Sequence, residues 1–452
     1  MECWATTEFE ESGFYDARVR NSIVKAADRV LSSRGASHSA AVGPGLRQAT
    51  GDAFANPKVT TDVMLEGHRI ATAARCSGYD TILVLSDSSS WSFTWHRAVE
   101  GLGPLNDKLS ARGIHSHCAL AVTEAGTPLG VLSAAFWVRD ATASKLSGSQ
   151  MATMAIEKKE SYKWLRSVEE TERALLGFLD SGGQVIVVAD RESDIIELFG
   201  MVRHENLHLL IRSRHPRIVE VGAERSSLPV ALEAVAPSGE YTITVPEQRG
   251  RPRRQARLSV KYLEAALVPP QGKRSKLARQ RIWVVHAVEI DAPTNVDPLS
   301  WTLLSTLKVA SHEEAMAMID RYKRRWVIER LHFTLKTGCF DVERLRFDDY
   351  ETLATALAFY FVVAWQVLWL IYISREEPQT PPEKHLEPHE LLILRRATNR
   401  PILTMLEAVR AIAELAGYAN YPKSPLPGIK MVWAGQRKLT DMIAGARLMG
   451  FI

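Results

Sequence analysis

Two aspartates each stand directly after a short, continuous apolar run. Asp87 follows Thr81–Ser86, and Asp190 follows Val185–Ala189. Runs of this kind are typical of buried strands, and in open α/β sheets ligands collect outside the carboxyl ends of the strands. Carboxylates presented there suit a hard divalent cation such as Mg²⁺. Either aspartate could instead cap the turn or helix that follows it.

A third carboxylate lies in the segment Arg321–Gly338. Here Tyr322, Arg325, Glu329 and Lys336 are separated by three, four and seven positions, so on a helix they share one face. A carboxylate, two cations and a phenol would then point the same way. The alternative is a solvated charged face with an Arg325–Glu329 pair worth roughly 0.3–0.5 kcal/mol.

The elements expected around these acids form an α/β domain. We predict strands over Thr81–Ser86, His117–Val122, Pro128–Trp137 and Val185–Ala189, and helices over Ser161–Leu179 and from His312 to about Lys336. Between about residues 205 and 305 strand patterns alternate with Pro and Gly. Because α/β elements flank this part on both sides, it is expected to be a β-rich insertion into one domain.

One apolar segment requires a decision about membranes. Residues 353–373 are long and apolar enough to cross a bilayer. Thr355 and Gln366 interrupt the run, and acidic residues stand just before it. We therefore interpret it as the buried helix of a large α/β domain and expect no membrane partner.

Composition sets looser bounds on function. The chain has 452 residues, a formal net charge of +4 and a pI near 8.8, so nucleic-acid binding has to be argued from local charge. Its four cysteines form no C-x-x-C pair, which disfavours a disulfide framework or a structural zinc site. The acidic N-terminus lacks the apolar stretch of a secretory signal. These features favour a cytoplasmic protein.

Several motifs together resemble those of the IS4-type (Tn5-like) DDE transposases. The spacing of Tyr322, Arg325, Glu329 and Lys336 is similar to that family's Tyr-x2-Arg-x3-Glu-x6-Lys signature. The other matching segments are Ala189–Asp194 (Ala-Asp-Arg-Glu-Ser-Asp), Asp87-Ser88-Ser89, Arg212–Arg217 (Arg-Ser-Arg-His-Pro-Arg) and Trp301–Ser305 (Trp-Thr-Leu-Leu-Ser). Serines replace the threonines usual after the first aspartate, and Thr334 stands where closer relatives carry lysine.

The resemblance implies an α/β, RNase H-like catalytic core interrupted by a β-rich insertion, with helical N- and C-terminal regions. It implies that Asp87, Asp190 and Glu329 are the catalytic metal ligands, holding two Mg²⁺ or Mn²⁺ ions per active site. By the resemblance, seven further residues are expected to contact DNA: Tyr322, Arg325, Lys336, Trp301, Trp326, Arg212 and Arg214. Trp301 and Trp326 would hold or replace a base displaced from the duplex, although Trp301 could instead be a core residue of the insertion. Arg253 and Arg254 are expected to contact DNA because they belong to the arginine-rich run Arg249–Arg257, which could track a DNA backbone or could instead be a solvated hairpin tip.

The resemblance also implies three regions and their partners. Residues 1–70 would bind the terminal inverted repeats of a transposable element, 71–375 would be the catalytic domain with its insertion at 205–305, and 376–452 would be a dimerisation domain. The expected partners are double-stranded terminal-repeat and target DNA, and a second copy of the chain on paired ends. The expected location is bacterial cytoplasm, with nucleoid association on DNA.

Three other functions compete with this interpretation. A metal-dependent nuclease or junction resolvase would use the same acids but would not need paired ends. A domesticated DNA-binding protein would have lost catalysis, which the intact acids disfavour. A membrane protein is disfavoured because the apolar segment falls where the resembling family has a core helix.

Overall fold

The computed structural model describes residues 4–32, 37–96, 98–106, 110–140, 154–245, 253–273, 276–294 and 296–451. The chain divides into two compact units, which are described separately. Unit 1 contains residues 1–78, 88–147 and 327–452, and unit 2 contains 79–87 and 148–326. The chain passes between the units inside strand β1 (Thr81–Ser92) and at the start of helix α12 (Trp326–Phe333).

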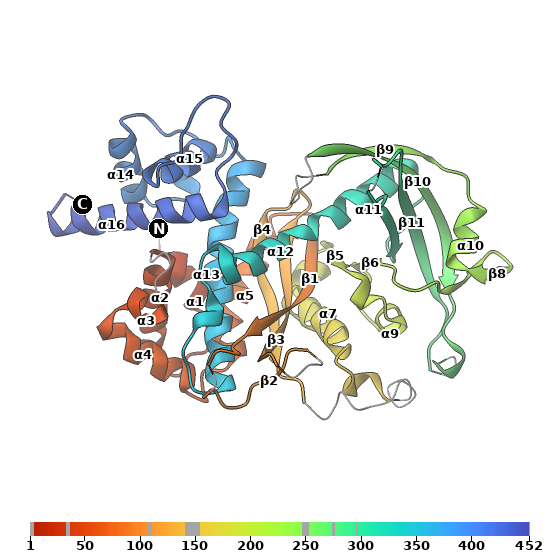
Figure 1. The fold of residues 1–452 in the computed structure, drawn as a ribbon, viewed down its shortest axis with the longest axis horizontal. Helices are drawn as coiled ribbons and strands as arrows, with labels where there is room; N and C mark the ends of the chain where they lie inside the picture. The colour runs from red at the N-terminus through yellow and green to blue at the C-terminus, as the bar shows by residue number, and fades with distance from the viewer. Residues whose placement is uncertain are drawn as a thin grey trace. The chain divides into compact units, whose positions relative to one another are not determined.

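Unit 2 is built on a mixed sheet whose elements can be followed in Figure 1. Its strands are β5 (Gln184–Ala189), β6 (Leu207–Arg212), β7 (Ile218–Val221), β8 (Glu224–Ser227), β9 (Gly239–Val245), β10 (Arg254–Leu267), β11 (Gln280–Ile290) and β12 (Ser300–Ser305). Its helices are α7 (Tyr162–Ala174), α8 (Leu176–Asp180), α9 (Ile196–Gly200), α10 (Leu228–Glu233) and α11 (His312–Arg324), with short 3-10 turns η2 (Ile156–Lys158), η3 (Arg191–Ser193) and η4 (Gln271–Lys273).

The sheet of unit 2 combines a parallel part with an antiparallel part. The strands run β1-β5-β6-β12-β11-β10-β7-β8, and β9 also pairs with β10. Strands β1, β5 and β6 are parallel, whereas β12, β11 and β10 are antiparallel. Residues Ile82–Ser86 and Val185–Ala189 are buried, as continuous apolar runs predict for parallel strands covered on both faces.

Unit 1 is mainly helical. Its helices are α1 (Trp4–Phe9), α2 (Ala17–Ser32), α3 (His38–Val42), α4 (Pro44–Ala55), α5 (Thr61–Cys76), α12, α13 (Tyr350–Glu376), α14 (Pro388–Thr398), α15 (Met405–Leu415) and α16 (Ile429–Leu448). It also holds strands β2 (Gly103–Pro104), β3 (Arg112–Thr123) and β4 (Pro128–Trp137), the π-helical turn η5 (Thr334–Gly338) and the 3-10 turns η6 (Val342–Arg344) and η7 (Pro382–Lys384).

The core of unit 1 surrounds α13. Among the described residues this is the one helix long and apolar enough to cross a membrane, and 83% of its apolar window is buried. It packs against α5, β4 and α15, and its course beside α5 is visible in Figure 1. A helix that is apolar on all sides and covered by protein is the expected pattern of a core helix.

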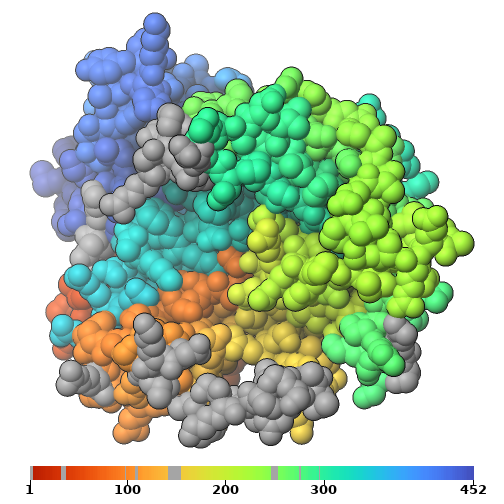
Figure 2. Space-filling model, turned by 45° about the vertical axis from the view of Figure 1, so that its right-hand side comes forward, coloured from red at the N-terminus to blue at the C-terminus, as the bar shows by residue number. Residues whose placement is uncertain are grey.

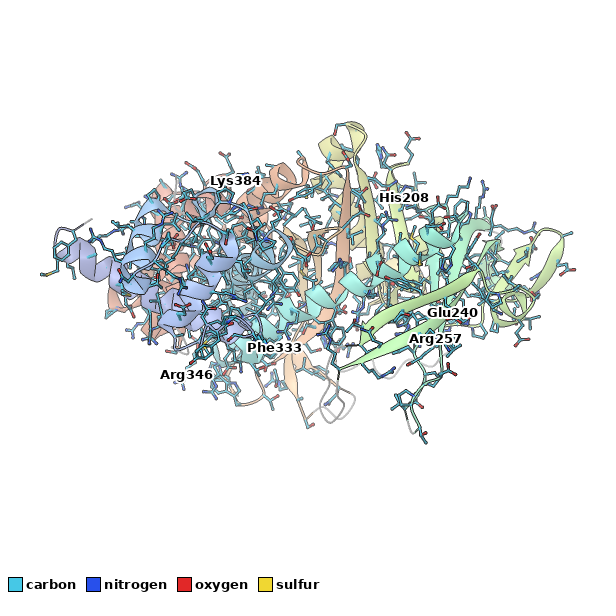
Figure 3. The ribbon with its side chains drawn as sticks, turned by 90° about the horizontal axis from the view of Figure 1, so that it is seen from above. His208, Glu240, Arg257, Phe333, Arg346 and Lys384 are labelled. Carbon is cyan, nitrogen blue, oxygen red and sulfur yellow. The ribbon has the colours of Figure 1, made fainter. Side chains whose placement is uncertain are left out.

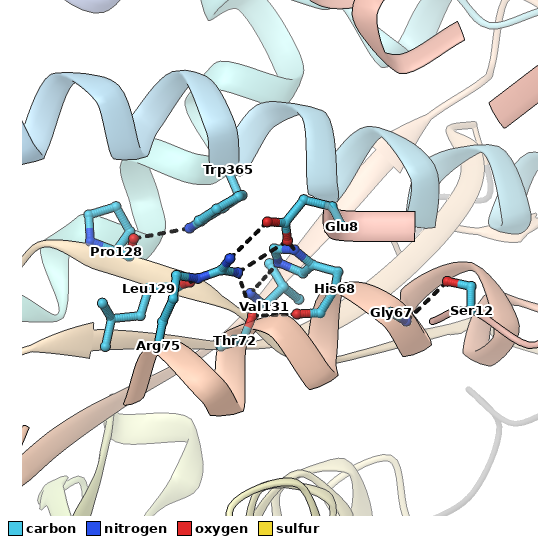
Figure 4. Close-up of polar contacts among 10 residues, drawn as sticks. All are labelled: Glu8, Ser12, Gly67, His68, Thr72, Arg75, Pro128, Leu129, Val131 and Trp365. Atoms are coloured by element: carbon cyan, nitrogen blue, oxygen red, sulfur yellow. Dashed lines mark hydrogen bonds and ion pairs between the residues drawn. The ribbon is translucent and has the colours of Figure 1, made fainter. Parts of the chain in front are cut away.

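A buried polar cluster anchors α1 to α5 in unit 1 (Figure 4). The Glu8 carboxylate pairs with the His68 imidazole and with the Arg75 guanidinium at 2.8 Å. Trp365 of α13 stacks under that guanidinium, 4.3 Å from its carbon, and His68 accepts the Val131 N–H of β4 at 2.8 Å. Helix α5 is therefore bonded both to α1 and to β4. The expected domain boundary at residue 70 would fall inside this helix.

Close packing of α5 on β4 depends on one glycine. Gly130 has φ +154°, and a Cβ there would lie 1.8 Å from the Thr72 hydroxyl oxygen. No side chain larger than hydrogen fits at this distance. The close approach of α5 to β4 lets the His68 imidazole reach the β4 backbone.

Several sequence-based expectations differ from the structure. The helix expected over Ser161–Leu179 is divided into α7 and α8, and the helix expected from His312 to about Lys336 is divided into α11, α12 and η5. Strand β1 does not end at Ser86 but continues to Ser92 beside β3, where Ser88 and Ser90 hydrogen-bond at 3.0 Å to His117 and His115. Strand β6, expected to open the insertion, instead pairs in parallel with β5. The sheet of unit 2 therefore runs on without a break from β5 into the β-rich part.

Candidate active site

Asp87 and Asp190 lie at equivalent positions on neighbouring strands of unit 2. Ser86 of β1 is paired with Ala189 of β5 in parallel register, and each aspartate is the next residue along the chain. Neighbouring strands are roughly 4.8 Å apart, so the two half-buried aspartates lie side by side at the point where β5 ends. This is the arrangement that the two apolar runs predict.

Asp190 also caps the turn that follows it. Its side-chain oxygen accepts the Glu192 N–H at 2.9 Å, so the capping role considered from the sequence is present. An ionised carboxylate offers roughly four lone-pair positions. Capping therefore fixes the orientation of Asp190 and leaves acceptor capacity for a cation.

Arg325 of the signature lies next to Asp87. Its guanidinium is 3.7 Å from the Asp87 carboxylate, and both side chains are only 14% exposed. Arg325 ends α11, and its N–H bonds to the Tyr322 carbonyl at 3.0 Å. The sequence suggested a pair between Arg325 and Glu329. The structure also places the Arg325 guanidinium beside Asp87.

Helix α11 is held against the β-rich part by a polar contact. The Tyr241 hydroxyl donates to the Asp320 carboxylate at 2.7 Å, and Lys323 reaches the same carboxylate at 2.8 Å. Burial, together with Asp320, raises the pKa of Tyr241 to about 12. The phenol therefore stays a donor at any ordinary pH and fixes the end of the helix that carries Arg325.

The aromatic residues expected at the DNA differ in exposure. Tyr322 is 5% exposed and packs edge-on against Trp301, with ring centroids 5.9 Å apart. Trp301 itself is half-buried in β12, whereas Trp326 is 60% exposed. Trp326 thus has the open indole face that base stacking needs. Tyr322 and Trp301 pack against each other.

The basic motif after β6 is organised by Asp194. The Asp194 side chain is fully buried, forms an ion pair with Arg217 at 2.6 Å and accepts the backbone N–H of Arg214 at 2.8 Å and of His215 at 3.2 Å. The side chain of Arg214 is exposed; the segment lies in the yellow-green surface of Figure 2. Asp194 therefore shapes the loop, while Arg214 stays on its surface.

A cavity of about 540 Å³ opens beside this motif in unit 2. Arg214, His215, Lys261 and His286 supply basic groups to its wall, and Thr302 lines it next to Trp301 in the chain. Burial, and then the charge of Lys261, lower the pKa of His286. Its imidazole accordingly adds little positive charge near neutral pH.

The remaining arginines expected at DNA have different surroundings. Arg212 donates to the Ser300 carbonyl at 2.9 Å. Arg254 forms a two-pronged ion pair with Glu289, whose side chain is 1% exposed, and the pKa of Glu289 is lowered chiefly by this contact. Arg253 is exposed. Arg254 is therefore a structural ion-pair partner, and Arg253 is the more accessible cation.

Arg257 continues this pattern of paired arginines. Its guanidinium lies 3.5 Å from Glu240 and also pairs with Asp291. Figure 3 shows Glu240 and Arg257 near each other on β9 and β10. Residues 249–252 of the arginine-rich run Arg249–Arg257 lie outside the described residues.

Unit 1 holds the third acid of the signature. Glu329 is half-buried on α12, and Lys336 lies in the π-helical turn η5, with its ammonium 5.1 Å from the centre of the Trp91 ring. Trp91 is fully buried and donates its indole N–H to Ser116 at 2.9 Å. π-Helical turns occur frequently at functional sites. The Lys336 ammonium therefore lies over an indole ring whose position is fixed.

Two residues that sequence reasoning did not single out become prominent. Asp194 belonged to a quoted motif, but its role as the anchor of a distant basic loop depends on a contact across the fold. His332 follows Glu329 by three positions on α12, a Glu-x-x-His spacing that is visible in the sequence. Its nearest rings, Trp91 and Phe361, could not be read from that spacing.

Part of the chain matches a known family model. Residues 165–365 match the family model described as a transposase DDE domain; this range contains Asp190 and Glu329 and excludes Asp87. A cryo-EM structure of the piggyBac transposase synaptic complex with hairpin DNA is similar at a TM-score of 0.35 and 10% identity. The match covers 90% of this chain and 60% of that one, and a likeness this low transfers neither fold nor function. Residues 165–365, 201 of the chain's 452 residues, are therefore similar to a transposase DDE domain.

Proposed function

We propose that this chain is a cut-and-paste DNA transposase of the IS4 (Tn5-like) group, with an RNase H-like core. The observation that carries the proposal is the pairing of Ser86 with Ala189, which brings Asp87, inside β1, beside Asp190, the residue that follows β5. The DDE-domain match and the four-residue signature support it. Glu329 completes the proposed set of acids.

The residues fit divalent metal ions by their chemistry. Three carboxylates provide the oxygen ligands that Mg²⁺ and Mn²⁺ prefer. Asp190 is already oriented by its bond to the Glu192 N–H, which is the support that a metal ligand needs. Two bound ions would activate an attacking oxygen and stabilise the leaving oxygen of a phosphodiester.

The protein's own residues would position the DNA. Arg325, beside Asp87, can hold a phosphate oxygen with its planar guanidinium. Exposed Arg214 and Arg253 can follow the backbone, so binding should weaken with salt. Trp326 is exposed and so available to a displaced base, and Arg214 and Lys261 line the cavity beside the basic motif of the same unit.

The proposal extends to the steps and partners of transposition. The ends of the element would be nicked, opened through a hairpin and joined to target DNA. Two copies of the chain would act on paired terminal repeats, with residues 376–452 providing the contact between copies. The exposed apolar side chains Leu448, Met449 and Phe451 at the end of α16 support a protein contact there.

The proposed role of Glu329 has a direct test. Glu329→Gln should abolish nicking of a DNA fragment that carries the element's ends, with Mg²⁺ present, while gel-shift binding to the same fragment stays within about threefold. Glu351→Gln, an exposed position on α13, is the matched control and should cleave normally. Cleavage by Glu329→Gln at the wild-type rate would remove Glu329 from the site.

A further inference from the structure

Helix α12 carries a second metal-binding side chain one turn after the proposed acid. Glu329 and His332 are three positions apart and so lie on one face of the helix. A carboxylate oxygen of Glu329 and an imidazole nitrogen of His332 lie within 4.8 Å of each other. The pair therefore offers one oxygen and one nitrogen ligand from a single rigid element.

The spacing is compatible with a shared ion. Metal–oxygen and metal–nitrogen bonds to first-row divalent ions are roughly 2.0–2.2 Å long, so two ligands of one ion lie at most about 4.4 Å apart. The 4.8 Å within which the two ligand atoms lie is close to this limit. Glu-x-x-His on one helix is the spacing by which helical carboxylate metal sites are built.

The imidazole is held in place by its surroundings. His332 is 6% exposed and lies edge-on between two rings of the same unit, with centroids 6.1 Å from Trp91 and 6.4 Å from Phe361. Trp91 is fixed in turn by its bond to Ser116 and carries Lys336 over its ring. A ligand whose rotamer is locked by packing binds a metal without a large ordering cost.

We propose that His332 is a nitrogen ligand to the divalent ion held by Glu329. This inference rests on the proposed function, in which Glu329 binds metal. It assigns the site a mixed oxygen and nitrogen ligand set. Mn²⁺ accepts imidazole more readily than Mg²⁺, which favours oxygen ligands and keeps its water. The site should therefore prefer Mn²⁺ over Mg²⁺ by more than an all-carboxylate site does.

The test uses the full chain loaded with Mn²⁺ alone. Pulsed electron paramagnetic resonance detects the coupling of Mn²⁺ to a bound imidazole nitrogen, and fluorescence or calorimetric titration gives the affinity. Wild-type protein should show the nitrogen coupling. His332→Gln and His332→Phe should lose it and bind Mn²⁺ at least tenfold more weakly, as even loss of an outer-shell partner costs 10–100-fold. Mg²⁺ affinity should fall less.

Two variants separate ligation from packing. His332→Phe keeps a ring between Trp91 and Phe361 but has no nitrogen, so a purely structural histidine would leave its Mn²⁺ affinity unchanged. His385→Gln removes an imidazole that packs 5.0 Å from Trp369 elsewhere in unit 1; it controls for the loss of any histidine and should keep the coupling.

The outcomes distinguish this inference from the proposed function. Mn²⁺ binding by the wild type without nitrogen coupling, and with undiminished affinity in His332→Phe, overturns the role of His332 and leaves the carboxylate site standing. An absence of Mn²⁺ binding to the wild type overturns both. Coupling that disappears only in the His332 variants supports the assignment.

Discussion

Replacing Asp194 by Asn should destabilise unit 2 through one buried ion pair. The Asp194 side chain is fully buried, and its partner Arg217 is 12% exposed. Removing one member of a buried pair leaves an uncompensated charge and costs roughly 3–5 kcal/mol. Asn keeps an acceptor for the backbone N–H of Arg214, so we expect the lower end, about 3 kcal/mol.

The assay is urea unfolding combined with hydrogen exchange of the loop amides. Asp194→Asn should lower the free energy of unfolding of unit 2 and speed exchange at Arg214 and His215, whose N–H groups bond to Asp194. Asp180→Asn is the matched control, because Asp180 is 63% exposed in its contact with His204. Exposed positions usually change stability by less than about 0.5 kcal/mol.

Equal stability of Asp194→Asn and Asp180→Asn would show that the buried ion pair does not stabilise unit 2. If Asp194→Asn unfolds within about 0.5 kcal/mol of Asp180→Asn, the pair with Arg217 contributes nothing to unit 2. Unchanged amide exchange at Arg214 would further show that Asp194 does not hold the basic loop.

Three further predictions concern charge and stacking. Burial raises the pKa of Glu390 to about 7, so the folded protein holds this proton more tightly than the unfolded chain. The free energy of unfolding should therefore fall as pH rises from about 4.5 to 7. Wild-type protein should lose roughly 2 kcal/mol between pH 5 and 8 in thermal unfolding, and Glu390→Gln should remove this loss. Trp301→Ala should slow hairpin formation more than first-strand nicking in a gel assay; equal slowing would contradict base displacement. Arg254→Ala should lower stability by about 3 kcal/mol because it strands the buried Glu289 carboxylate. Arg253→Ala should instead weaken DNA binding and flatten its salt dependence with stability unchanged; the reverse result would show that the two arginines had been assigned the wrong roles.

The sequence predicted the strands of the site better than their ends. The apolar run Val185–Ala189 predicts β5, and the structure buries every residue of this run. The polar half of β1 carries no such signal. Ser88 and Ser90 belong to the part of the strand that lies beside β3, and their hydroxyls hydrogen-bond to histidines of β3 more than twenty residues away. Pairing partners of this kind are absent from a local pattern.

The charge of a segment could be predicted from sequence, but its partners could not. Arg254 and Arg257 belong to a run that favours DNA contact, yet both are paired with acids of the same unit. The spacing of Tyr322 with Arg325 predicts a shared face, and Tyr322 is nevertheless buried against Trp301. Ion pairs and ring contacts form between distant segments, so they require the fold.

The most direct test of the account is a structure of the full chain soaked in Mn²⁺, with the metal located by anomalous scattering. We expect two ions roughly 3.5–4 Å apart, bound by the carboxylates of Asp87, Asp190 and Glu329. Ions bound elsewhere, or carboxylates too far apart to share them, would contradict the proposed catalytic site and with it the proposed DDE chemistry.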